Sequence, residues 1–165
     1  MVFLNNLRMS LLAAWLGAAI YFSAVVAPSA FAVLRSFGLN NAGEIAGTIV
    51  TRTLSVINVS GLLLSLLLLG TVFMLKKSLS RWTFLLQISL FVVIAIATAV
   101  GEWVIAAKMR GLRLAMQGQI DQLPLSDPNR MAFASLHGYS VMALGIAMIA
   151  GLIALLVIAK HSKSN

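Results

Sequence analysis

The residue best suited to chemistry in this sequence is His137, in the stretch FASLHGYSV at the start of the last apolar run. The only other histidine, His161, lies in the polar C-terminal tail, so a haem held by two histidines is not expected. One histidine is enough to be the axial ligand of a chlorophyll-type magnesium. Ser135 and Ser140 do not complete a Ser-His-acid set, because residues two or three apart along a helix need not share a hydrogen bond.

Charged side chains at the ends of the apolar runs form a polar layer with His137. Arg52 precedes the second run and Glu102 closes the third. Metal hydrolysis needs three protein ligands, and Glu102 and His137 offer only two. The first interpretation is structural pairing of Arg52 with Glu102, and of His137 with Glu102 or a backbone carbonyl. Ligand binding comes second and catalysis last, with the candidates Arg52, Glu102, Arg110, His137 and Ser140.

The composition indicates a membrane protein. Of the 165 residues, 61% are hydrophobic and only 10% are charged, more apolar surface than a soluble domain of this length can bury. Without cysteine, the chain has no disulfide, thiolate nucleophile or zinc–thiolate site. Basic residues give a net charge of +8, but in a membrane protein they fix topology and touch anionic lipid. A nucleic-acid partner is therefore not expected.

Runs without charge predict membrane-spanning helices, because lipid leaves backbone groups no other partner. The first run is too long for the apolar region of a signal peptide, although it ends in SAFA, which resembles a cleavage site. It is interpreted as a retained helix that bends or ends near Pro28. The predicted fold is a single all-α four-helix membrane bundle with spans at about 9–34, 53–75, 82–105 and 136–159.

An even number of spans places both termini on one side of the membrane. The Lys and Arg residues divide evenly between the two sides, so the decision rests on the short, basic loop Lys76–Arg81. Short loops have the greatest effect on orientation. Both termini are therefore expected to be cytoplasmic, in the inner membrane of a bacterium.

Two helix-start signals lie well before their spans. Asn41 and Glu44 resemble a capping box, and Asp127-Pro128 is typical of an N-cap followed by the first helical residue. Helices from these caps to Leu75 and Ala159 would be nearly 50 Å long at 1.5 Å per residue, against a hydrocarbon core of ~30 Å. The second and fourth helices should therefore project beyond the bilayer on the same side.

The third helix is expected to project as well, through an amphipathic extension over 108–120. Its apolar residues Met109, Leu112, Met116 and Ile120 follow helical spacing, while Arg110 and Arg113 fall on another face. Such a face suits the membrane interface, with anionic lipid as a further partner at roughly 1 kcal/mol per basic residue. Gly118 and Pro124 are expected to end the helix.

Small residues at intervals of four predict close helix packing. Packing within the bundle is the favoured interpretation and a partner subunit the alternative. Trp82 and Trp103 bracket the third span and are expected to anchor it at the two membrane interfaces. The two stripes of small residues are Ala143, Ala147 and Gly151 in the last span, and Ser10, Ala14 and Ala18 in the first.

Four stretches in order, WLGAAIYFSAVVAPSAF, AGEIAGTIVTR, GEWVIAAKMR and FASLHGYS, resemble the transmembrane protein 205-like family. The resemblance covers nearly the whole chain, and the order of the stretches carries it more than any one of them. It implies a four-helix membrane bundle without an agreed reaction, cofactor or catalytic residue. On the matching positions it points to Arg52, Glu102, Trp103, Arg110, His137 and Ser140.

These observations favour a non-enzymatic, multi-pass membrane protein. The first hypothesis is an accessory subunit of a larger membrane complex, of electron-transfer or photosynthetic type, that contacts lipid or pigment. The alternative is a small-molecule or lipid transporter or binding protein that uses the polar layer. The sequence requires no cofactor. Membrane lipids and other membrane proteins are the expected partners.

Overall fold

The computed structural model describes residues 2–116, 120 and 123–163. This part of the chain contains helices and no strand, which confirms the all-α class for it. In chain order the elements are α1 (Val2–Tyr21), the π-helical turn η1 (Phe22–Val26), α2 (Ala27–Ser36), α3 (Ala42–Met74), the 3-10 turn η2 (Lys76–Ser78), α4 (Arg81–Ala99), the π-helical turn η3 (Val100–Ala106), α5 (Ala107–Ala115) and α6 (Pro128–Lys163).

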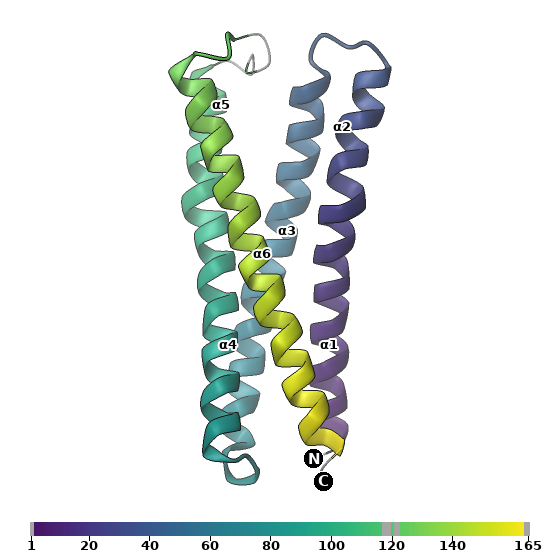
Figure 1. The fold of residues 1–165 in the computed structure, drawn as a ribbon, viewed down its shortest axis with the longest axis vertical. Helices are drawn as coiled ribbons and strands as arrows, with labels where there is room; N and C mark the ends of the chain where they lie inside the picture. The colour runs from purple at the N-terminus through teal and green to yellow at the C-terminus, as the bar shows by residue number, and fades with distance from the viewer. Residues whose placement is uncertain (1, 117–119, 121–122, 164–165) are drawn as a thin grey trace.

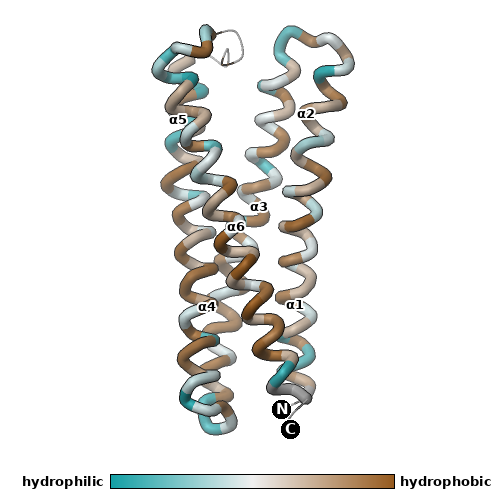
Figure 2. The backbone as a smooth tube through the Cα atoms, in the orientation of Figure 1, coloured by the Kyte–Doolittle hydropathy of each residue, from teal (hydrophilic) through white to brown (hydrophobic). Residues whose placement is uncertain are grey.

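Within the described residues, four helical rods are long and apolar enough to cross a membrane: Phe3–Ser36, Ala42–Met74, Arg81–Ala115 and Pro128–Lys160. They run up and down, so that both termini lie at one end of the bundle (Figure 1). Polar residues gather toward the two ends of the rods (Figure 2). We call the end with the termini the terminal end, and the end with the α2–α3 and α5–α6 connections the distal end.

The predicted capping chemistry is present at the start of α6 but not at the start of α3. Asp127 caps α6 as predicted, since its Oδ1 accepts hydrogen bonds from the backbone N–H groups of Asn129 (2.8 Å) and Arg130 (3.2 Å). Asn41 precedes α3 as predicted, but its side chain makes no capping hydrogen bond. The Glu44 carboxylate does not complete a capping box either. It accepts a hydrogen bond from the backbone N–H of Ile120 (3.0 Å), a residue that follows α5 in the chain.

The first rod passes through Pro28 without ending there. The π-helical turn η1 comes just before it, with the N–H of Ala27 bonded to the carbonyl of Phe22, and Pro28 falls in the first turn of α2. Pro28 has no N–H to donate to the preceding turn, and the wider π-helical turn before it accommodates this gap within a continuous rod. The rod ends at Ser36, followed by Gly38 in the left-handed conformation (φ 66°).

The main apolar core fills the middle and terminal half of the bundle. Trp15 of α1 lies at its centre and donates its indole N–H to the carbonyl of Ile57 on α3 (3.0 Å). Gly61 of α3 makes room for the ring, because a Cβ there would lie 2.8 Å from it. All four rods contribute buried side chains: Leu12, Trp15, Leu16, Ala19 and Phe22; Ile57, Leu68 and Val72; Phe91 and Ile94; and Leu144, Ala147, Ala150, Ala154 and Ile158.

In the distal half the four-helix core divides into two pairs. A second apolar cluster joins η3 and α5 to α6 through Ile105, Met109 and Ala143. On the other side α2 packs mainly on α3 and has no buried residue of its own. Figure 1 shows the two pairs diverging toward the distal end. Polar side chains, described below, lie between them.

The predicted amphipathic extension is shorter than expected. α5 ends at Ala115, where the N–H of Met116 closes the last turn on the carbonyl of Leu112. Met109 and Ile120 are buried, as the apolar spacing predicts. Residues 117–119, including the predicted helix breaker Gly118, lie outside the described residues.

Candidate ligand-binding site

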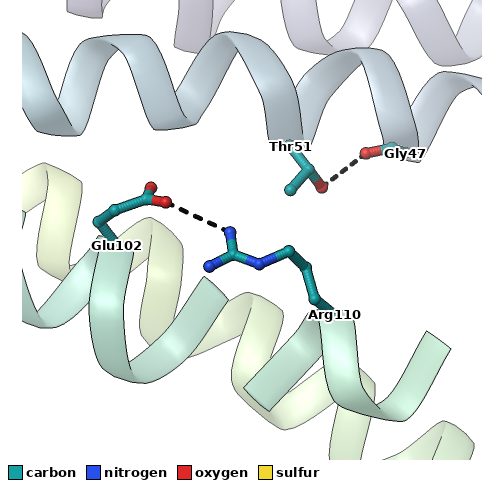
Figure 3. A network of polar contacts seen from close by, with 4 residues as sticks. All are labelled: Gly47, Thr51, Glu102 and Arg110. Carbon is teal, nitrogen blue, oxygen red and sulfur yellow. Dashed lines mark hydrogen bonds and ion pairs between the residues drawn. The ribbon is translucent and has the colours of Figure 1, made fainter. Parts of the chain in front are cut away.

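The centre of the polar layer is an ion pair between Glu102 and Arg110. Glu102 belongs to η3 and its side chain is only 10% exposed. Its Oε1 accepts a hydrogen bond from Nη1 of Arg110 at 3.2 Å, and the two groups point toward one another beneath α3 (Figure 3). The second carboxylate oxygen, Oε2, is buried without a partner in the described part of the chain.

The π-helical turn η3 positions this carboxylate against α3. Gly101 allows the close approach, because a Cβ there would lie 3.1 Å from Nδ2 of the buried Asn58 on α3. Glu102 and Arg110 are eight residues apart, which is not a neighbour spacing on a regular α-helix. Single π-helical turns inside α-helices are frequent at functional sites. Here the turn contains the buried acid, Glu102, and continues toward Arg110 in α5.

Arg110 is held on one side and exposed on the other. Its side chain is 48% exposed, and the described residues offer its guanidinium no hydrogen-bond acceptor besides Glu102. The nearby Thr51 of α3 donates its hydroxyl to the carbonyl of Gly47 on its own helix (2.6 Å; Figure 3). The guanidinium is therefore oriented by a buried acid, with further N–H donors available.

The partners predicted for Glu102 are wrong. Arg52 is exposed on α3 and His137 is exposed on α6, and neither is bonded to Glu102. Both residues lie on apolar rods, and their spacing fixes the level along the helix but not the direction in which the side chain points. Arg110, which the sequence also marked, takes the place predicted for Arg52. Ser140 is buried on α6.

Two further polar residues connect the separated helix pairs at the distal end, and the sequence did not mark them as contacts. Arg113 of α5 reaches Gly47 of α3, where a Cβ would clash with its Nη2. The same guanidinium lies over the ring of Phe133 on α6, 5.2 Å from its centroid. Glu44 of α3 bonds to Ile120, as described above. The local sequence signal for the contact between Arg113 and α3 was Gly47, one helical turn before Thr51.

The two stripes of small residues behave differently. Ala143, Ala147 and Gly151 of α6 are buried, and a Cβ on Gly151 would lie 3.3 Å from the ring of Trp15. The stripe on α1 is exposed, which corrects the expectation that it packs inside the bundle: Ser10, Ala14 and Ala18 all point outward. Trp82, at the start of the third rod, and Trp103, in η3, are exposed as well.

A buried polar cluster near the terminal end was not predicted from the sequence. Arg8 of α1, one of the basic residues that entered the prediction only through the count for orientation, is 2% exposed and hydrogen-bonded to Asn5 and to Gln87 of α4. A glutamine inside an otherwise apolar span was the available signal. Among the described residues, no group of three or more His, Asp or Glu side chains is placed to hold a metal ion.

A family model described as "Domain of unknown function (DUF4149)" matches residues 10–118, well over half of the chain. The chain belongs to the DUF4149 family. The match includes Arg52, Glu102 and Arg110 but neither Arg8 nor His137. It supports a multi-pass membrane protein of an uncharacterised family and does not confirm the narrower transmembrane protein 205-like assignment. No curated protein and no solved structure matches this DUF4149 chain.

Proposed function

We propose that the protein is a non-enzymatic membrane protein that binds a zwitterionic polar group, such as a phosphoethanolamine lipid headgroup, at its distal end. One observation carries the proposal: the buried Glu102 holds Arg110 with one carboxylate oxygen and leaves the other without a partner. A buried acceptor without a partner is unfavourable by about 1–3 kcal/mol. A ligand that supplies a donor there removes that penalty.

The chemistry of the Glu102–Arg110 pair favours a ligand that carries both a positive and a negative group. Oε2 of Glu102 accepts hydrogen bonds and favours an ammonium group. The remaining N–H donors of Arg110 match the oxygens of a phosphate or carboxylate, for which the guanidinium fork is well shaped. Because Glu102 and Arg110 neutralise each other, a ligand with no net charge fits the site better than an anion or a cation.

The length of the third rod supports a site at the level of lipid headgroups. Glu102 lies about 32 Å along the helix from Arg81, close to the ~30 Å thickness of a hydrocarbon core. Trp82 and Trp103 then fall at the two interfaces, where exposed tryptophans are common. In this arrangement α5 and the distal parts of α3 and α6 project beyond the bilayer.

The test compares two lipids that differ only at the amine. Native mass spectrometry of the delipidated protein should show retention of phosphatidylethanolamine over phosphatidylcholine, whose quaternary amine has no N–H to donate to Glu102. Glu102→Gln should weaken phosphatidylethanolamine retention roughly 10-fold, because it removes the charge from that hydrogen bond. The control Arg35→Gln removes an exposed charge that lies over Phe31 in the distal part of α2. Equal retention of both lipids by the wild-type protein would contradict the proposal.

A second candidate function is an accessory subunit of a larger membrane complex. The exposed stripe Ser10, Ala14 and Ala18 favours it, since small residues allow a second helix to approach closely. The natural chain has no cysteine, so Ala14→Cys introduces a single reactive thiol. Cross-linking in native membranes should give a discrete larger product with Ala14→Cys, but not with Ile20→Cys on another exposed face. Identical patterns for both variants count against this function.

For the orientation we propose both termini in the cytoplasm of a bacterium, with the protein in its inner membrane. The short basic turn Lys76–Ser78 at the terminal end supports this assignment. A membrane-impermeant thiol reagent applied to spheroplasts should label Ser126→Cys at the distal end and leave Ser78→Cys unlabelled. The reverse pattern contradicts the orientation.

A further inference from the structure

Arg8 is a buried cation that the proposed function does not use. Its guanidinium donates hydrogen bonds to Oδ1 of Asn5 (3.3 Å) and to Oε1 of Gln87. Arg8 is 2% exposed and Gln87 is fully buried. Nε of Arg8 and Nε2 of Gln87 have no hydrogen-bond partner in the described part of the chain. Both of these atoms carry hydrogen and can only donate, so the cluster has donors in excess and no unused acceptor among its buried atoms.

No acidic side chain compensates the charge of Arg8 within the described residues. Of the four acidic residues in the chain, Glu44 and Asp127 lie at helix starts of the distal end, and Glu102 is paired with Arg110. The fourth, Asp121, lies outside the described residues and between α5 and α6 in the chain. The terminal end instead adds further positive charge on its short turn, at Lys76, Lys77 and Arg81.

The cluster lies within reach of the lipid headgroups. Arg8 is about 9 Å along α1 from Val2, and Gln87 is about 9 Å along α4 from Arg81. One turn deeper, Leu12 and Phe91 are fully buried and close the cluster off with apolar side chains. Because Arg8 and Gln87 are themselves closed off from solvent, a polar ligand that enters from the terminal end reaches their donor atoms only when side chains there move aside.

A buried charge without a counter-charge is strongly unfavourable, and a buried arginine usually has a carboxylate or phosphate partner. Arginine also presents several N–H donors in a planar fork that matches phosphate oxygens. Two unused donors and an uncompensated positive charge together require an acceptor that carries negative charge. A neutral water molecule supplies the acceptor but leaves the charge uncompensated.

We propose that Arg8 and Gln87, supported by Asn5, bind a phosphate group at the terminal end, from either a phospholipid headgroup or free phosphate. Nε–H of Arg8 and the amide N–H of Gln87 donate to the phosphate oxygens, and the phosphate charge compensates the guanidinium. This site is separate from the Glu102–Arg110 pair, and the proposal does not depend on the proposed function.

The test is a thermal unfolding measurement on the delipidated, full-length protein in a neutral detergent. Phosphatidylglycerol or inorganic phosphate is added to about 100 times its dissociation constant, or to its solubility limit. Binding at this saturation should raise Tm by roughly 5–10 °C. A rise with the lipid alone identifies a headgroup, and a rise with both probes identifies the phosphate itself. No rise with either probe overturns the proposal.

A near-isosteric variant tests the site itself. Gln87→Glu places a carboxylate against Arg8, which compensates the charge internally and should weaken phosphate binding roughly 10- to 100-fold. Lys77→Gln removes an exposed cation at the same end and should leave the rise in Tm unchanged. If Gln87→Glu retains the wild-type rise, the proposal is wrong. Arg8→Gln is the second variant, and it should lose the response as well.

Discussion

The two ends of this bundle bury charge in opposite ways. At the distal end a buried acid, Glu102, is paired with an arginine that is 48% exposed, and the atom without a partner is an acceptor. At the terminal end a buried arginine, Arg8, has only amide partners, and the atoms without partners are donors. The packing differs too, since all four rods share the main core whereas the distal half divides into two pairs.

This difference indicates what each end is suited to bind. A neutral pair with one unused acceptor and several donors fits a zwitterionic group. A lone buried cation with unused donors fits an anion. Because the two sites lie at opposite ends of the bundle and share no residue, a substitution at one should leave ligand binding at the other unchanged.

The largest expected effect lies in the core that separates the two sites. Gly61→Ala places a methyl group 2.8 Å from the Trp15 ring, which is too rigid to move aside. Overpacking of this kind typically reduces stability by 1–3 kcal/mol, so we expect a loss of about 2 kcal/mol in the free energy of unfolding. Gly70→Ala on the same helix meets no atom within 4 Å and serves as the control. Equal unfolding midpoints in a denaturant titration would show that the Trp15 contact is not restrictive.

A smaller effect of opposite sign is expected at the terminal end. Gln87→Glu should raise the stability of the ligand-free protein by about 1–2 kcal/mol, because an amide partner of Arg8 becomes a charged one. Asn6→Asp makes the same amide-to-carboxylate change at an exposed position near the terminal end and should not reproduce the gain. The stability change in each of the two variants is measured by comparing unfolding midpoints in the same detergent. A loss of stability in Gln87→Glu would mean that the charge of Arg8 is already compensated.

Breaking the Glu102–Arg110 pair at the distal end should change the stability of the protein less. Glu102→Gln should lower the free energy of unfolding by about 0.5–1 kcal/mol, because Arg110 is half exposed and can turn to solvent or headgroups when it loses its partner. The same denaturant titration measures the change. A loss above about 3 kcal/mol, which is typical of a broken buried ion pair, would remove the contrast between the two ends.

The smallest effect is expected where α3 meets α5. Gly47→Ala would place its methyl group against the guanidinium of Arg113, which is the far end of a flexible side chain and can shift. We expect a change below about 0.5 kcal/mol, as for most substitutions outside a packed core. If Gly47→Ala proves as damaging as Gly61→Ala, the distal half is as tightly packed as the main core.

Charge-free runs and capping residues were enough to predict the helices. Asp127 marked the start of α6, and Asn41 marked that of α3 even though its side chain makes no cap. The partners of Glu102 could not be predicted in this way, because a rod that is apolar on nearly every face does not reveal its rotation. Arg52 and His137 lie at suitable levels and still point outward.

One local feature and one long-range contact explain the remaining errors. Glu102 lies in the π-helical turn η3 and Arg110 in the α-helix after it, so a search at regular helical spacing does not pair them. The contact between Arg8 and Gln87 joins residues 79 apart in the chain. Each of these two residues alone was consistent with a span end or with packing between helices.

The most direct test of the two-site account is a lipid competition experiment. Native mass spectrometry would measure phosphatidylethanolamine and phosphatidylglycerol retained by the wild-type protein, Glu102→Gln and Gln87→Glu. The account predicts that Glu102→Gln lowers the ratio of retained phosphatidylethanolamine to phosphatidylglycerol, and that Gln87→Glu raises it. Equal losses of both lipids in the two variants, or no loss in either, would contradict it.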